Sequence, residues 1–157
     1  PGQLVAYPIM RLGRPGSDGR LPRTDYVGYL RQIEKVLIRA LAVWGIAARR
    51  SSGNTGVWVQ ADGGEGDAGA TAQPERLAKI AAIGVRLSRW VTSHGFALNV
   101  ATDLSPFDLI VPCGIQGRGV TSLERLLDRA VPLDGVMSKL ADHFAAAFGR
   151  LIVSEGR

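Results

Sequence analysis

The chain has 157 residues, of which 46% are apolar, and this fits one globular domain and excludes a disordered chain. Its single cysteine excludes an internal disulfide framework and an all-cysteine metal site, and two histidines argue against a histidine-rich metal centre. No stretch is long enough to span a membrane and no secretory leader is visible, so we expect a cytoplasmic protein without membrane contact.

The net charge of +5 is concentrated near the amino-terminal end, because residues 11–50 hold nine Lys or Arg and three Asp or Glu. A basic face suits nucleic acid, a membrane surface or an acidic protein, and it is also compatible with a merely solvated surface. Aromatic residues are not interleaved with the arginines at a stacking spacing, so we expect no nucleic-acid partner.

The first elements are a strand and a long helix. We expect the strand over Gln3–Met10, followed by a Gly- and Pro-rich turn. Apolar residues then recur every three or four positions, which predicts a helix over Thr24–Trp44. Thr24 or Asp25 is expected to cap its start, and Gly45 to end it.

The middle of the chain is predicted to be mostly strands. Short strands are expected at Ile46–Arg49 and Gly56–Gln60, a loop at Ala61–Gln73, and longer strands at Leu77–Val91 and Gly95–Val100. In the last strand, alternation places Phe96, Leu98 and Val100 on one face and Ala97 and Asn99 on the other.

The remainder is predicted to be a structured loop and two helices. The loop covers Leu104–Ile115, with one helical turn, and a capping box at Thr121–Glu124 starts a short helix. Asp134 is expected to cap a last helix that ends at Gly149. Five of its residues are expected to face inward: Val136, Met137, Leu140, Phe144 and Phe148. The mixture predicts an α+β fold with a mixed, largely antiparallel sheet packed by helices.

Cys113 lies between Pro112 and Gly114, so it occupies a shaped turn. A thiol on such a turn is accessible to a substrate carbonyl, and a nearby cation would lower its pKa. The alternative is that Cys113 is a small buried apolar residue.

Lys79 is the candidate cation, because it lies in an otherwise apolar run. A lysine in such surroundings suits proton transfer, although it is also compatible with an edge strand. Gly84 and the small residues at His94–Ala97 permit close approach of a ligand, or mark a bulge. His94 is either a structural histidine or, paired with Cys113, the base of a papain-like site.

Several runs occur together in order: Pro1–Pro8, Thr55–Val59, Lys79–Arg86, His94–Val100, Asp103–Phe107, Pro112–Gly114 and Thr121–Leu123. Together they resemble the lipoyl(octanoyl) transferases of lipoate biosynthesis, from residue 1 to about residue 127. The resemblance implies a fold like that of biotin and lipoate protein ligases. It also implies an acyltransferase that works through an acyl-thioester intermediate in protein lipoylation.

By motif position, the resemblance makes Cys113 the acyl-accepting nucleophile and Lys79 the residue that lowers the thiol pKa and transfers protons. It implies substrate binding by Gly2, Gln3, Ala82, Ile83, Gly84, Gly95, Phe96 and Ala97. Octanoyl-acyl carrier protein would be the donor. The acceptors would be lipoyl domains of 2-oxoacid dehydrogenases and the glycine cleavage H protein. No cofactor, ATP or metal is expected.

In the family, Pro-Gly-Gln ends a longer motif with an Arg-Gly-Gly loop and a His-Gly pair, and this chain begins inside that motif. We therefore expect residues 1–157 to be a single catalytic domain that lacks its amino-terminal part. Two alternatives remain: an ATP-dependent lipoate or biotin-type protein ligase, which needs no cysteine, and an inactive truncated remnant.

Overall fold

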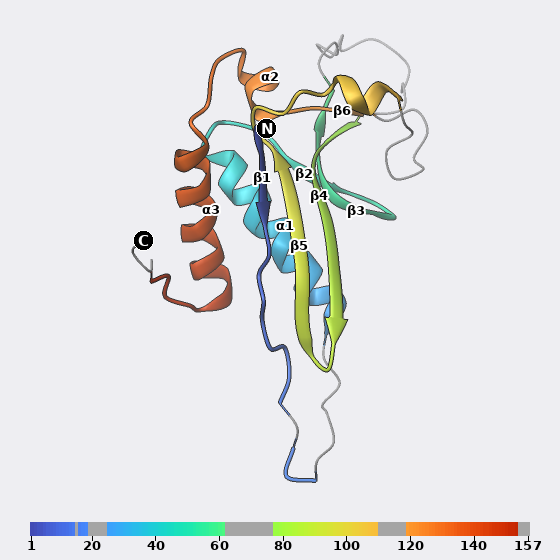
Figure 1. Cartoon of the computed structure of the whole chain (residues 1–157), viewed down its shortest axis with the longest axis vertical. Helices are drawn as coiled ribbons and strands as arrows, with labels where there is room; N and C mark the ends of the chain where they lie inside the picture. The colour runs from blue at the N-terminus through green and yellow to red at the C-terminus, as the bar shows by residue number, and fades with distance from the viewer. Residues whose placement is uncertain (15, 19–24, 62–76, 110–118, 154–157) are drawn as a thin grey trace, which may run out of the picture.

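The computed structural model describes residues 1–14, 16–18, 25–61, 77–109 and 119–153. In this part of the chain, one six-stranded sheet is packed by helices α1 and α3 (Figure 1). The strands are β1 (Gln3–Ala6), β2 (Arg49–Ser51), β3 (Asn54–Gln60), β4 (Leu77–Ser88), β5 (Val91–Asn99) and β6 (Gly119–Val120). The helices are α1 (Tyr26–Ala42), α2 (Leu123–Leu127), α3 (Leu133–Phe148) and the 3-10 helix η1 (Ser105–Leu109). The predicted fold class is confirmed.

The sheet has the order β1-β5-β4-β3-β2, with antiparallel neighbours throughout. Strands β4 and β5 form a long hairpin, paired from Ala81 opposite Leu98 to Ser88 opposite Val91. Strand β6 is the exception, because it runs parallel to β4 beside Ala78 and Lys79. The sheet is therefore mixed but largely antiparallel, as predicted.

Helix α1 provides most of the core on one face of the sheet. Its apolar stripe buries Ile33, Leu37 and Leu41 completely or nearly so against Ile80 and Leu98 of the strands. Complete burial of such a side chain contributes about 1.5–3 kcal/mol. The carboxylate of Asp25 caps the helix by accepting a hydrogen bond from the Gly28 amide at 2.6 Å, as the sequence predicts.

Helix α3 packs beside α1, which Figure 1 shows behind the strands. Val136 and Leu140 are buried, and the rings of Phe144 and Phe148 stack at 4.4 Å between centroids. The predicted inward position of Met137 is wrong, because its side chain is 56% exposed.

A bulge in β4 decides which side chains reach each face. Val57 pairs with Ala81 but Trp58 pairs with Lys79, so Ile80 is an extra residue without a partner on β3. Ile80 and Ala81 therefore both join the helix-side core, together with Ala78. Lys79 is turned with Trp58 to the opposite face, which we call the open face.

Three predicted details differ from the structure. Strand β1 ends at Ala6 instead of Met10, since Pro8 has no amide hydrogen, although Met10 still hydrogen-bonds to Thr92. Ser122, not Thr121, caps α2 by accepting from the Arg125 amide at 3.3 Å. Asp134 does not cap α3: the helix starts after Pro132, and Asp134 lies in the first turn, where its charge suits the helix dipole.

The predicted boundaries of the other strands also shift: β3 starts at Asn54 instead of Gly56, and β5 covers Val91–Asn99 instead of Gly95–Val100. The strand expected at Ile46–Arg49 is found at Arg49–Ser51, and the long strand from Leu77 ends at Ser88. The alternation predicted for Gly95–Val100 is confirmed, since Phe96, Leu98 and Val100 belong to the core cluster. The loop expected at Ala61–Gln73 lies outside the described residues beyond Ala61.

Candidate active site

Lys79 lies near the start of β4. There the neighbouring strand is β6, whereas from Ala81 onward the neighbour on that side is β5. Only 9% of the residue is exposed, and its ammonium nitrogen lies 4.7 Å from the centroid of the Trp58 ring. A cation over an indole face is stabilised by the ring's electron distribution, by about 2 kcal/mol where water is largely excluded. The Lys79 ammonium group is thus packed against an aromatic ring in a largely buried position.

Gly56 supports the aliphatic part of the Lys79 side chain. A Cβ atom at Gly56 would lie 3.4 Å from Lys79 Cε and only 2.7 Å from the Ala81 carbonyl oxygen, and its φ of +125° also favours glycine. The Gly56 amide donates to Glu34 Oε1 at 3.4 Å. The buried Glu34 carboxylate also forms ion pairs with Arg31 at 2.7 Å and Arg50 at 2.8 Å. Trp58, Gly56 and Glu34 are not among the site residues predicted from the sequence.

The two predicted acyl-binding segments are brought together as neighbours on β4 and β5. Ala82 pairs with Ala97 and Gly84 pairs with Gly95, so four small residues form a stripe on the sheet. Ala82 and Gly84 are exposed. The same register pairs Ile83 with Phe96, whose side chains pack against the helix-side core.

Gln3 is linked to Lys79 through hydrogen bonds across the sheet, and Gly2 is bonded to the end of β5. The Gln3 amide group donates to Asn99 Oδ1 at 2.9 Å, and Asn99 Nδ2 donates to the Thr121 carbonyl at 3.1 Å. The Thr121 amide in turn donates to the Lys79 carbonyl at 3.1 Å. The Gly2 carbonyl accepts from the amides of residues 100 and 101, which fixes the start of β1 beside β5.

Cys113 lies outside the described residues, but both flanks of its segment are described. The preceding flank is η1, where Asp103 Oδ1 accepts a hydrogen bond from the Ser105 amide at 3.0 Å. This bond holds the pKa of Asp103 below its ordinary value. The following flank is β6, where Val120 is paired with Lys79.

His94 lies at the far end of the β4–β5 hairpin. Its side chain is exposed, its φ is +60°, and its ring makes an edge-to-face contact with Tyr7 at 6.0 Å between centroids. Val85, its partner on β4, is six residues along the strand from Lys79. The described residues contain no group of three or more His, Cys, Asp or Glu that could hold a metal ion.

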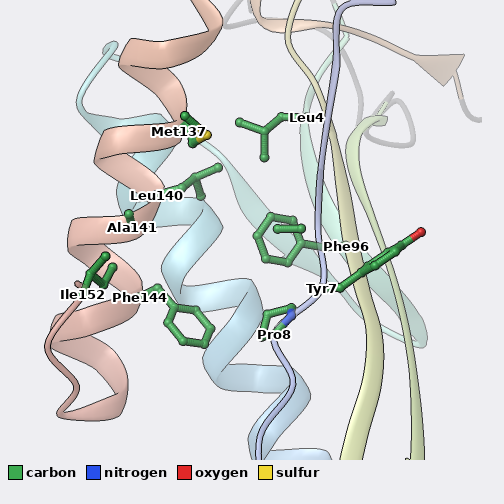
Figure 2. Close-up of a pocket in the computed structure, with 10 residues that line it drawn as sticks. Leu4, Tyr7, Pro8, Phe96, Met137, Leu140, Ala141, Phe144 and Ile152 are labelled. Atoms are coloured by element: carbon green, nitrogen blue, oxygen red, sulfur yellow. The ribbon is translucent and has the colours of Figure 1, made fainter. Parts of the chain in front are cut away.

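An apolar hollow of about 280 Å³ lies on the helix side of the sheet, between α3 and the strands β1 and β5 (Figure 2). Its lining is formed by Leu4, Ala6, Tyr7, Pro8, Phe96, Met137, Leu140, Ala141, Phe144 and Ile152. Leu4 and Phe96 belong to the helix-side core, whereas Lys79 lies on the open face. The sheet therefore separates this hollow from Lys79.

The fold has solved counterparts among protein ligases. A bipartite lipoate protein ligase from Thermoplasma acidophilum matches 98% of this chain and 54% of its own chain, with a TM-score of 0.64 and 17% identity. A biotin protein ligase from Aquifex aeolicus matches 94% of this chain and 53% of its own, with a TM-score of 0.59 and 14% identity. These likenesses define the fold as that of the lipoate and biotin protein ligases.

The sequence narrows this class to one family. The family model described as the lipoyl protein ligase A/B catalytic domain matches residues 1–145, and the chain belongs to this family. An octanoyltransferase from Acidobacterium capsulatum is 45% identical over 98% of this chain, and one from Chloroflexus aggregans is 49% identical over 94%. The chain spans 59% and 58% of the lengths of these two relatives. Within the described part of the chain, no helix has both the length and the apolar character needed to cross a bilayer.

Proposed function

We propose that this protein is an octanoyltransferase of protein lipoylation that works through a thioester on Cys113. The supporting observation is the position of Lys79, held on the open face beside the small-residue stripe and paired through its backbone with β6. The donor would be octanoyl-acyl carrier protein. The acceptor would be a lysine of a lipoyl domain, in 2-oxoacid dehydrogenases or the glycine cleavage H protein.

Chain length supports the pairing of Cys113 with Lys79. Cys113 precedes Gly119 by six residues, and six residues span at most about 20 Å when fully extended. Gly119 is itself paired with Ala78, the neighbour of Lys79. The length of the chain between Cys113 and Gly119 therefore permits the proposed pairing.

The proposed reaction has two balanced steps. The Cys113 thiolate attacks the thioester carbonyl of the donor, a carbon–sulfur bond forms to Cys113, and the carrier thiol leaves with a proton. The acceptor ε-amine then attacks this new thioester, an amide bond forms, and the thiolate of Cys113 is released. The first step exchanges one thioester for another and the second is downhill, so no ATP is consumed.

Lys79 has two roles in this scheme. Its ammonium group would lower the pKa of the Cys113 thiol and so increase the thiolate fraction at neutral pH. It would also give a proton to the leaving carrier thiolate and recover one from the attacking amine. The contact with the Trp58 ring holds the ammonium group in position for both roles.

The stripe of Ala82, Gly84, Gly95 and Ala97 would accommodate the acyl chain at its exposed members Ala82 and Gly84, since Ala6 and Pro8 occupy the space at Gly95. Each buried CH₂ group contributes about 0.8 kcal/mol to binding. Replacement of Gly84 by Leu would fill this space, while Arg86→Leu places the same side chain two residues further from Lys79.

Intact-protein mass spectrometry with octanoyl-acyl carrier protein tests the proposal. We expect one octanoyl adduct, released by hydroxylamine as a thioester, absent in Cys113→Ala and formed much more slowly in Lys79→Met. Gly84→Leu should reduce adduct formation about tenfold or more, whereas Arg86→Leu should not. An adduct that survives Cys113→Ala, or no adduct on the wild-type protein, would overturn the assignment. ATP-dependent use of free octanoate would favour a ligase instead.

A further inference from the structure

A basic groove lies between the outer side of α1 and the chain around β2, two elements labelled in Figure 1. It has a volume of about 820 Å³. Five of its nine lining residues are cationic and none is acidic: Arg31, Lys35, Arg39, Arg49 and Arg50.

Three of these cations form a single row on α1. Arg31, Lys35 and Arg39 are spaced by four residues, so consecutive members are neighbours on the helix surface. Like charges at this spacing destabilise a helix. The row therefore reduces helix stability slightly, which points to a role outside folding.

The buried Glu34 carboxylate orients two of the five cations. It forms ion pairs with Arg31 and Arg50, whose side chains remain 47% and 44% exposed at the groove. Among the described residues, neither Lys35 nor Arg39 has an ion-pair partner. The groove thus presents fixed arginines together with two cations that are available to an anionic partner.

We infer that this groove is the docking surface for an acidic face of the acyl-donor carrier protein, an inference that rests on the proposed function. Complementary charge would accelerate encounter and orient the carrier. No aromatic residue lines the groove, so it lacks a stacking platform for single-stranded nucleic acid.

The position of the groove favours the donor over the acceptor. Glu34 contacts the Gly56 amide, and Gly56 borders Lys79, so the groove flanks the site without opening on the face that holds Lys79. A carrier that presents its thioester on a long flexible arm can dock beside the site and still reach it. An acceptor lysine has only its own short side chain, so its domain must lie directly over the site.

The test compares two double charge reversals that change the net charge equally. Lys35→Glu with Arg39→Glu removes charge from the groove. Arg129→Glu with Lys139→Glu removes it from exposed positions elsewhere. Binding of fluorescently labelled octanoyl carrier protein, with a non-cleavable amide in place of the thioester, is followed by anisotropy at low and physiological ionic strength.

We expect the groove reversal to weaken carrier binding by about tenfold or more at low salt and to reduce its salt dependence, and the control to remain within about twofold. Equal effects of the two reversals, or a loss of lipoyl-domain binding with carrier binding intact, would overturn the inference. If the groove reversal fails to fold by circular dichroism, Lys35→Gln with Arg39→Gln serves in its place, with a smaller expected loss.

A small donor separates this inference from the proposed function. Octanoyl-N-acetylcysteamine carries the thioester without a carrier protein, so the groove reversal should label Cys113 from it at the wild-type rate. A wild-type protein that is labelled by neither donor would refute the proposed function. The binding comparison would still show whether the groove binds the carrier protein. Equal loss with both donors would show that the reversal damages the site and would contradict docking.

Discussion

The ammonium nitrogen of Lys79 lies 4.7 Å from the centroid of the Trp58 ring, and the two residues are direct partners across β4 and β3. Both residues are buried, yet neither belongs to the helix-side core. The structure therefore keeps a lysine and an aromatic ring together in a location that apolar packing alone does not require.

Replacement of Trp58 should impair the function of Lys79 according to how much of the ring is lost. Trp58→Leu should slow thioester formation about tenfold, because the leucine offers no aromatic face to hold the ammonium group. Trp58→Phe should lose less, since a phenyl ring retains part of the attraction. Stopped-flow acylation measures both rates, with urea unfolding as the control for stability. Equal losses in the two variants would contradict a role for the ring.

Gly95 and Gly84 are opposite each other in the hairpin but should respond differently to alanine. A Cβ atom at Gly95 would overlap the Ala6 carbonyl oxygen, so Gly95→Ala must displace β1 and should cost about 1–3 kcal/mol. A Cβ atom at Gly84 meets no heavy atom within 4 Å, so Gly84→Ala should change stability by about 0.5 kcal/mol or less. Urea unfolding of both variants measures the contrast, and similar losses would show that the approach of β1 is not tight.

Glu34 should be more important for stability than its charged neighbours on α1. Glu34→Gln weakens both arginine ion pairs and should cost about 2 kcal/mol, less than for a fully buried pair because both arginines reach solvent. Lys35→Gln on the exposed side should change stability by about 0.5 kcal/mol or less. The free energies of unfolding give the comparison, and an equal effect of both substitutions would contradict a structural role for the carboxylate.

Asp103 should make the start of η1 sensitive to acid. The amide of Ser105 donates to its carboxylate, which lowers its pKa below the ordinary value of 3.8. Since the folded pKa is the lower one, this contribution to stability is present above the ordinary pKa and is lost as the pH falls through the folded pKa. A pH titration of the Ser105 amide resonance should show this transition in the wild type. If the same transition of the Ser105 amide persisted in Asp103→Asn, a group other than Asp103 would be its cause.

Local patterns in the sequence predicted the elements whose causes are local. The apolar period of α1 and the cap at Asp25 are confirmed, and so is the alternation in β5 that buries Phe96, Leu98 and Val100. In these cases the residues that determine the structure are only a few positions apart. The small-residue segments of β4 and β5 also lie together, since a tight hairpin joins them.

Features that depend on pairing between distant segments could not be predicted in this way. In the sequence, Glu34 looks like an ordinary polar residue of a helix. Its burial is explained only by the contacts with Arg50 and Gly56, which are distant in the sequence. The proximity of Trp58 to Lys79 depends on the register between β3 and β4. The caps of α2 and α3 were misplaced by one or two residues, because several neighbouring side chains can act as caps and the backbone geometry selects among them.

The unpaired Ile80 decides which side of β4 carries Lys79. In a regular strand without the bulge, Trp58 would lie opposite Ile80 and Val59 opposite Lys79, so Lys79 would turn toward the apolar layer beneath the helices. Any redesign of this strand therefore has to preserve the bulge before it preserves the composition.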